Sequence, residues 1–350
     1  MAYTDIDDPS AYFQTLLYTG DGNDNRNLVN TGNSDLQPDW IWNKRRDSAS
    51  NHFIFDSIRG ASNIIVADTN EAESANTNQL QAFQTNGFQL GSDNGSNGSN
   101  RTMVAWQWKA GTSVSGNSTG SGTAKAYTGS VSTASGFSII RYVGNGTAGH
   151  TIPHHLGKKP DAILIKHLGD GQQWASQWSP LGATKVMRFA TANAVSDSNT
   201  RWNDTEPTSS VFTLGTEHEG NTNDGNHIAY CFTNIQGYSK VGSYVGNGNA
   251  NGTFVYTGFK PRWIMIKGTN IARNWGINDT KRSPINQTQD SLYANVSDAE
   301  TGSGNYIDFL SNGFKLRDSA LTMNGAYNYI YMAFAENPFV TSTGVPATAR

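Results

Sequence analysis

Cysteine, charged residues and long apolar runs are all scarce in this 350-residue chain. The single cysteine, Cys231, excludes an intramolecular disulfide and a cysteine-based zinc site. Charged residues make up 15% of the chain, against about a quarter in a typical soluble protein. No run of about 18 apolar residues is present, so no membrane-spanning helix is expected. With a net charge of -3 the chain has no basic field to collect phosphates, and nucleic-acid binding is disfavoured.

The first residues and the common catalytic motifs give further exclusions. The opening MAYTDIDDPSAYF has neither a basic region nor an apolar stretch, so the sequence predicts no signal peptide and synthesis in a cytoplasm. The P-loop motif, H-E-x-x-H and a nucleophile elbow between a strand and a helix are missing. GNGTAG from Gly144 formally fits a dinucleotide-binding loop, but no helix is expected after it. The sequence therefore predicts a non-enzymatic protein with no catalytic residues and no cofactor.

Uncharged turn-forming residues, and not charged ones, supply most of the polarity of the chain. Asn, Ser, Thr, Gln and 37 Gly supply the polarity, and this mixture suits turns and short strands. No stretch has a sustained apolar period of 3.6 residues, so an all-β fold is predicted.

Self-comparison reveals three segments that share landmarks in the same order. The segments open with LYTGDG from Leu17, RYVGNG from Arg141 and SYVGNG from Ser243. Asp-Gly and Asn-Gly pairs favour type I′ turns, in which both central residues have positive φ. Each opening is therefore expected to be a strand that runs into a tight turn.

A proline followed by an apolar run and a lysine is the second landmark. The runs are PDWIWNK from Pro38, PDAILIK from Pro160 and PRWIMIK from Pro261. Each is expected to be a mostly buried strand that begins at its proline, where no ladder donor is lost. The lysines that end the runs are expected to cap a strand edge or to pair with a carboxylate; they are Lys44, Lys166 and Lys267.

Two later landmarks complete the repeat. NGFQLG, SVFTLG and NGFKLR hold an aromatic residue in common, and VAW, IAY and MAF follow 17 to 19 residues later, centred on Ala105, Ala229 and Ala333. We therefore predict three tandem, diverged modules of about 100 residues, each a β-sandwich or jelly roll. The expected boundaries are a leader at 1–15, modules at 16–110, 136–237 and 238–350 with a short C-terminal tail, and a flexible or extended Gly/Ser/Thr-rich linker at 111–135. The leader is expected either to dock on a partner or neighbouring subunit or to fray.

Histidines and carboxylates offer weak chemical signals. His150, His154 and His155 lie close together with His167 nearby, a spacing that zinc or nickel sites use, but a solvated loop is the favoured interpretation and no metal site is predicted. A glycosidase needs two facing carboxylates. Asp56 and Asp279 stand eighteen residues past their prolines, where the second copy has Trp178 instead, and nothing marks them as a catalytic pair.

Aromatic residues give the candidate ligand site. Sugars stack on tryptophan and tyrosine beside amide and carboxylate groups. Four tryptophans lie outside the clearest strands and are the candidate ligand-binding residues, with core packing as the alternative for each: Trp174, Trp178, Trp202 and Trp275. Trp40, Trp42 and Trp263 lie in the post-proline runs, where the core is expected.

The repeat resembles a module of virion proteins from marine bacteriophages. The resemblance rests on YVGNGTAGHTIPHHLGKKPDAILIK, SSVFTLG and IAYCF, on GSYVGNGNANGTFVYTGFKPRWIMIK, FLSNGFKLR and YIYMAFAENPF, and on the opening DDPSAYFQTLLYTGDG. It covers nearly the whole chain and concerns structural landmarks, so it implies no catalytic residues. SSVF replaces the turn NGF in the second copy, which puts that turn in doubt.

The resemblance implies a structural protein of a virion, assembled in the host cytoplasm. The expected role is a tail fibre or appendage component that attaches to the host surface through loop-borne glycan or protein contacts. The expected partners are other virion proteins, host-surface glycan and further copies of the chain, with a homotrimer by analogy to fibres. A capsid decoration or knob protein and a tailspike-like glycan hydrolase are the alternatives.

Overall fold

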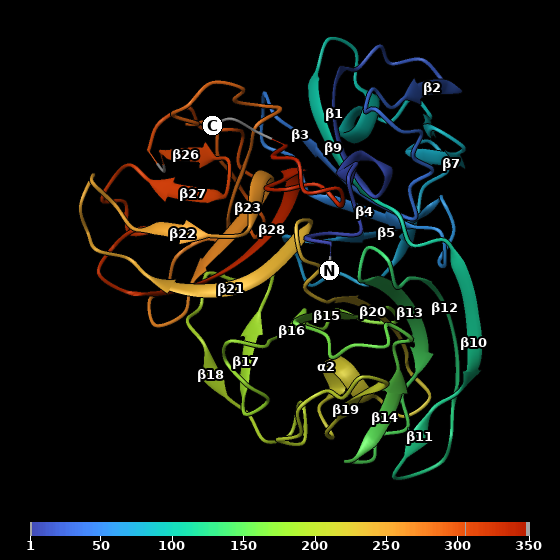
Figure 1. Ribbon diagram of the computed structural model, residues 1–350. Coiled ribbons are helices and arrows are strands. Elements are labelled where there is room, and N and C mark those ends of the chain that lie inside the picture. The colour runs from blue at the N-terminus through green and yellow to red at the C-terminus, as the bar shows by residue number, and fades with distance from the viewer. Residues whose placement is uncertain (1, 305, 348–350) are drawn as a thin grey trace.

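The computed structural model describes residues 2–304 and 306–347, and it confirms the all-β prediction. Six antiparallel sheets lie in three lobes, one large and one small sheet in each (Figure 1). We call the stretches that form these sheet pairs the first part (13–110), the second part (111–237) and the third part (238–347). No helix among the described residues is long and apolar enough to cross a membrane.

The first part combines a sheet ordered β1-β9-β3-β4-β5-β6 with one ordered β2-β8-β7. A 3₁₀ turn, η1 (Pro9–Ala11), precedes it. Its elements are β1 (Phe13–Thr19), β2 (Arg26–Val29), β3 (Trp40–Arg45), β4 (Phe53–Asp56), β5 (Asn63–Val66), β6 (Ser74–Ala75), β7 (Leu80–Gln84), β8 (Gly87–Leu90), α1 (Asn94–Asn97) and β9 (Thr102–Trp108).

The second part combines a sheet ordered β10-β12-β13-β20-β15-β16-β17-β18 with one ordered β11-β14-β19. Its elements are β10 (Thr112–Asn117), β11 (Thr119–Gly120), β12 (Ala126–Ser132), β13 (Phe137–Val143), β14 (His150–Pro153), β15 (Ala162–His167), β16 (Ala175–Trp178), β17 (Lys185–Arg188), β18 (Ser196–Asp197), β19 (Val211–Leu214), α2 (His218–Asn221) and β20 (Asn226–Phe232).

The third part combines a sheet ordered β21-β28-β23-β24-β25 with one ordered β22-β27-β26. Its elements are β21 (Ser239–Val245), β22 (Phe254–Tyr256), β23 (Phe259–Gly268), β24 (Gly276–Asp279), β25 (Leu292–Tyr293), β26 (Ile307–Leu310), β27 (Gly313–Leu316) and β28 (Asn328–Pro338).

The strand after each proline is buried on both faces, as its run of apolar residues predicts. In β3, Ile41 packs between the two sheets of the first part, whereas Trp40 and Trp42 point to the opposite face of the large sheet. Successive side chains of a strand alternate between faces, and β15 and β23 alternate in the same way. Each large sheet therefore contributes to two cores.

One core is common to all three parts: the one on the face of each large sheet that points away from its small sheet. It contains the outer-face residues of all three large sheets and is rich in tryptophan and phenylalanine. The ring of Trp40 has its centroid 4.5 Å from that of Trp108 in the first part, and 4.8 Å and 5.8 Å from those of Tyr230 and Phe232 in the second part. The three sheet pairs are therefore packed around one aromatic centre.

Strand register corrects one of the sequence landmarks. The strand after the proline pairs Asn43 with Ala105 and Ile165 with Ala229, but the corresponding Ile266 pairs with Tyr331, not with Ala333. The true counterparts thus lie a constant 17 residues after Phe88, Phe212 and Phe314. A shift of two residues in a strand keeps every side chain on its face, which is why the pattern alone did not reveal it.

The stretch predicted as a linker differs in structure from the prediction. Residues 111–135 form β10, β11 and β12 and extend the sheets of the second part, so they are not a flexible linker. Tyr127 and Val131 alternate into the core and anchor this Gly/Ser/Thr-rich stretch. The ends of the predicted leader and tail, residues 1 and 348–350, lie outside the described residues.

The leader docks on its own chain. Tyr3 Oη donates to Gly258 O at 2.7 Å, and Thr4 Oγ1 donates to Gln236 O at 2.7 Å. Ile6 is buried in the shared core, and Asp7 accepts from the backbone N–H of Ser342 at 2.6 Å. Residues 3–7 therefore hold the start of the chain against its last part.

Candidate functional site

The four candidate tryptophans are core residues, so the prediction that they bind a ligand is wrong. Each is at most 1% exposed: Trp174, Trp178, Trp202 and Trp275. A sugar needs an open ring face on which to stack. Three of them belong to the shared core, and Trp202 packs inside the second part. The alternative of core packing, which also holds for Trp40, Trp42 and Trp263, is confirmed.

Two of these tryptophans join neighbouring parts through their indole N–H groups. Trp174 Nε1 donates to Val66 O of the first part at 2.9 Å. Trp275 Nε1 donates to Thr191 O of the second part at 3.2 Å. These side chains lie fourteen residues past their prolines. The repeat therefore identified these two positions as equivalent. It did not show that the residues in contact with them come from another part of the chain.

The lysines that stand next to last in the post-proline strands make the same contact three times. Each Nζ donates to the carbonyl of its own next residue at 2.8 Å and to a carbonyl of a neighbouring part. The cross-part bonds are Lys44 to Ser297 at 3.2 Å, Lys166 to Asn70 at 3.4 Å and Lys267 to Ala192 at 3.2 Å. Backbone carbonyls, and not the expected carboxylates or solvent, satisfy these buried ammonium groups.

A backbone hydrogen bond accompanies each lysine contact. The N–H groups of Glu300, Glu73 and Val195 donate to carbonyls of the neighbouring part, and each stands three residues after the lysine's acceptor. The carbonyls accept eight residues past each proline, and they belong to Arg46, Leu168 and Thr269. The first part thus contacts the third, the second contacts the first, and the third contacts the second, which closes a ring.

These buried lysines predict an unusual dependence of stability on pH. Burial lowers the pKa of Lys44, Lys166 and Lys267 to about 8, from an ordinary value of 10.5. Between pH 8 and 9 the unfolded chain therefore holds more protons than the folded chain, and the free energy of unfolding rises with pH. The rise amounts to at most about 1.4 kcal/mol per pH unit for each lysine. Urea unfolding at pH 7.5, 8.0, 8.5 and 9.0 measures it.

The matched controls are Lys166→Met, expected to remove about a third of the slope on this linkage, and Lys158→Met at an exposed lysine, expected to leave it unchanged. The series stops at pH 9 because burial raises the pKa of the Cys231 thiol from 9.0 to about 12. Above pH 9 this thiol ionises more readily in the unfolded chain than in the folded chain, so the free energy of unfolding falls as pH rises. A flat profile from pH 8 to 9 contradicts the prediction.

The two aspartates considered for catalysis are buried ion-pair partners. Asp56 Oδ2 lies 2.5 Å from Arg59 Nε and accepts from Tyr230 Oη of the second part at 2.6 Å. Asp279 Oδ2 lies 2.6 Å from Arg282 Nε and accepts from Trp106 Nε1 of the first part at 3.0 Å. All four charged side chains have 0% exposure. Each pair holds two parts together, and neither carboxylate faces a cleft.

The third contact of the ring replaces the whole polar arrangement with apolar residues. At the positions of aspartate and arginine the second part has Trp178 and Leu181. At the position of the donors Trp106 and Tyr230, the register places Met332. Trp178 and Met332 are both buried in the shared core. The aspartate acceptor, the arginine cation and the tryptophan or tyrosine donor are therefore all replaced by apolar residues at this contact.

The histidines divide into two groups. His150 is buried and bonds Asn221 and Ser118 at 2.9 Å and 2.6 Å. His154 is also buried, with its pKa lowered to about 4 by burial, and His155 bonds Tyr127 Oη at 2.8 Å. These three do not meet at one point, and the solvated-loop interpretation is wrong for the first two. His167 lies instead beside Asp170 and His218, two residues that sequence reasoning did not select.

Exposed aromatic side chains occur together on β22, which is an edge strand of the third part. Phe254 is 43% exposed and Tyr256 is 50% exposed, with buried Val255 between them. Residues two apart on a strand share a face. The Nζ of Lys240 lies 5.4 Å from the centroid of the Tyr256 ring. These rings are open to a ligand, and sequence reasoning did not select them.

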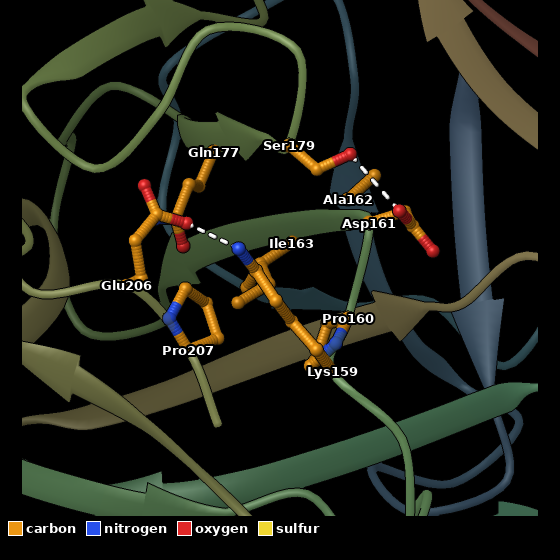
Figure 2. A pocket seen from close by; sticks show the side chains of 9 residues that line it. All are labelled: Lys159, Pro160, Asp161, Ala162, Ile163, Gln177, Ser179, Glu206 and Pro207. Carbon is orange, nitrogen blue, oxygen red and sulfur yellow. Dashed lines mark hydrogen bonds and ion pairs between the residues drawn. The ribbon is translucent and has the colours of Figure 1, made fainter. Parts of the chain in front are cut away.

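Two hollows differ in what they can hold. A groove of about 820 Å³ in the third part is lined by the exposed Ile285 together with Lys260, Arg262, Asp308 and Glu336. Figure 2 shows a second hollow, where Lys159 is paired with Glu206 and Ser179 with Asp161. Both side-chain amide atoms of the buried Gln177, which lines the second hollow, lack a hydrogen-bond partner among the described residues.

Comparison with known families adds one finding. A family model described as "Domain of unknown function (DUF7483)" matches residues 8–338. The chain belongs to this family. The DUF7483 match includes all three sheet pairs and every contact of the ring described above. No curated protein and no solved structure matches the chain.

Proposed function

We propose that this DUF7483 chain is a non-enzymatic structural protein of a bacteriophage virion, of the tail fibre or appendage type, that attaches to the host surface. The observation that carries the proposal is that the side chains common to the three parts are buried between them. Buried lysines, aspartates and tryptophans are used to hold a ring together. The resemblance of the repeat and of the opening residues to marine phage virion proteins supplies the context.

We also propose that the ring consists of three diverged copies of one β-sandwich module. The lysine contact, its companion backbone bond and the order of the central strands recur at equivalent positions, which supports this origin. A ring within one chain supplies a threefold body without association. The homotrimer expected by analogy to fibres stays a prediction, and light scattering on the purified chain gives the mass that decides it.

Attachment is assigned to the exposed face of β22. Replacing both rings, Phe254→Ala with Tyr256→Ala, is expected to weaken binding to host cells or host polysaccharide about tenfold or more, because open aromatic faces dominate such contacts. Binding of the labelled chain to host cells measures this. Leu321→Ala, at an apolar residue 41% exposed elsewhere in the third part, is the matched control and keeps full binding. Equal binding by all variants contradicts the assignment.

The position in the particle tests the wider proposal. Antibody labelling of purified virions in the electron microscope is expected to place the chain on the tail or an appendage. Labelling over the head would favour the alternative of a capsid decoration protein, and absence from purified virions would refute a virion role. Shortening of host polysaccharide by the purified chain would instead identify a hydrolase.

A further inference from the structure

A histidine and carboxylate cluster lies at the end of β15 in the second part. His167 Nδ1 is 2.9 Å from Asp170 Oδ1, and His218 Nε2 is 2.9 Å from Asp170 Oδ2. Each residue offers one ligand atom, and the three atoms lie within 4.8 Å of one another. His167 ends β15, Asp170 belongs to the following loop, and His218 begins α2. We propose that these three residues form a binding site for a divalent transition metal ion such as Zn²⁺.

The donor set and its spacing suit such an ion. Two imidazole nitrogens and one carboxylate are common zinc ligands, and a water molecule completes the four positions of an open site. Bonds of 2.0–2.1 Å place tetrahedral ligand atoms about 3.3 Å apart. The two nitrogen-to-oxygen gaps of 2.9 Å, one to each oxygen of Asp170, need to open by a few tenths of an ångström, and the separations of up to 4.8 Å within the set need to close. The His218 side chain is 52% exposed and Asp170 43% exposed, which leaves both free to adjust and gives the ion a way in.

Unused imidazole nitrogens give a second, independent indication. The Nε2 atoms of His167 and His227 are buried without a hydrogen-bond partner among the described residues. The two rings lie edge to face with centroids 4.7 Å apart, and the rings of His167 and His218 are stacked at 5.3 Å. Buried polar atoms are nearly always satisfied. The described residues therefore leave polar atoms unsatisfied beside the Asp170 cluster, although neither of these two Nε2 atoms is the nitrogen that faces Asp170.

Existing contacts set what the ion must displace. The backbone N–H groups of Gly169 and Asp170 point at His167 Nδ1 from 3.1 Å, and Lys166 Nζ lies 3.4 Å from the carbonyl oxygen of Asp170. Both N–H groups donate to the Nδ1 lone pair, so an ion that binds at Nδ1 has to displace these two hydrogen bonds. The equivalents of His167 in the other parts are Arg45 and Gly268, so the shared architecture does not require the histidine.

Titration calorimetry of the untagged, chelator-treated chain with Zn²⁺ tests the site. One ion per chain is expected, with binding weakened at least about tenfold by His218→Ala and by Asp170→Asn. Asp170→Asn retains an oxygen acceptor for His218 and removes the charge, so it separates metal ligation from a purely structural role. His155→Ala, at the other partly exposed histidine, is the matched control and binds as the unaltered chain does.

A spectroscopic readout keeps the test independent of folding. The Co²⁺-loaded chain is expected to show the visible absorption of a tetrahedral nitrogen and oxygen site, and His218→Ala to remove it while circular dichroism stays that of the unaltered chain. Saturable binding that survives both His218→Ala and Asp170→Asn would overturn the proposal. Absence of saturable binding to the unaltered chain would overturn it as well. Neither result bears on the proposed virion role.

Discussion

Arg282→Met is expected to lower the free energy of unfolding by about 3–5 kcal/mol, because it leaves the buried Asp279 without its cation. Arg282 Nε lies 2.6 Å from Asp279 Oδ2, and its Nη1 and Nη2 donate to Glu300 and to the carbonyl of Ile277, both at 2.9 Å. Glu300 also pairs with Arg46 of the first part at 2.6 Å. The loss thus falls on a contact of the ring. Guanidinium unfolding followed by circular dichroism measures it.

The third contact suggests how this loss can be recovered. Asp279→Leu combined with Arg282→Met removes both charges together and imitates the apolar pair Trp178 and Leu181. The double variant is expected to regain much of the stability, less about 1–3 kcal/mol for the orphaned Trp106 N–H. Lys159→Met breaks a half-exposed pair with Glu206 and is the control, expected to cost less than about 1 kcal/mol. A double variant no more stable than the single one contradicts this account.

Trp40→Ala is expected to cost about 3–5 kcal/mol and to destabilise two parts at once. The ring contacts Trp108 and Trp42 of the first part and three rings of the second part, Phe137, Tyr230 and Phe232. The substitution would leave a cavity in the core that the three parts form together. Tryptophan fluorescence and far-ultraviolet circular dichroism, recorded through the same denaturant series, measure the change.

The two probes are expected to give coincident transitions for the unaltered chain and for Trp40→Ala. Sharing of the aromatic core couples the unfolding of the three parts, and coincidence of different probes is the test of one cooperative unit. Phe254→Ala, which removes an exposed ring, is the control and is expected to change stability by less than about 0.5 kcal/mol. Separate transitions for separate parts would contradict the shared core.

The sequence predicts this fold well where the signal is local. The strands after the prolines follow from apolar runs. The Asp-Gly and Asn-Gly pairs do mark the ends of strands, but they are not type I′ turns, because only their glycines, Gly22, Gly146 and Gly248, have positive φ. The strands in 111–135 were missed because β10 is mostly exposed and carries few apolar residues. Its place is fixed by pairing with β12, which in turn pairs with β13. Pairing of this kind has no signature within the strand itself.

The candidate site was mispredicted for a different reason. Trp174 and Trp275 lie outside the most regular strands of their own part, so they looked available for a ligand, but a neighbouring part covers them. Asp170 and His218 are 48 residues apart, and only the return of the chain through α2 brings them together. Burial between repeats and convergence of loops are tertiary facts, and one copy of the pattern does not contain them.

The ring has a consequence for the order in which the chain folds. The first part cannot complete its contact with the third until Ser297 and Glu300 exist, some 250 residues after Lys44 and Arg46. The contact of Asp7 forms later still, because its partner Ser342 is synthesised later. During synthesis the large sheets of the first two parts must expose tryptophan faces that are later hidden. Contacts so distant in sequence slow folding and leave apolar surface open to aggregation. Synthesis of residues 297–342 therefore precedes closure of the ring, which makes closure a late step of folding.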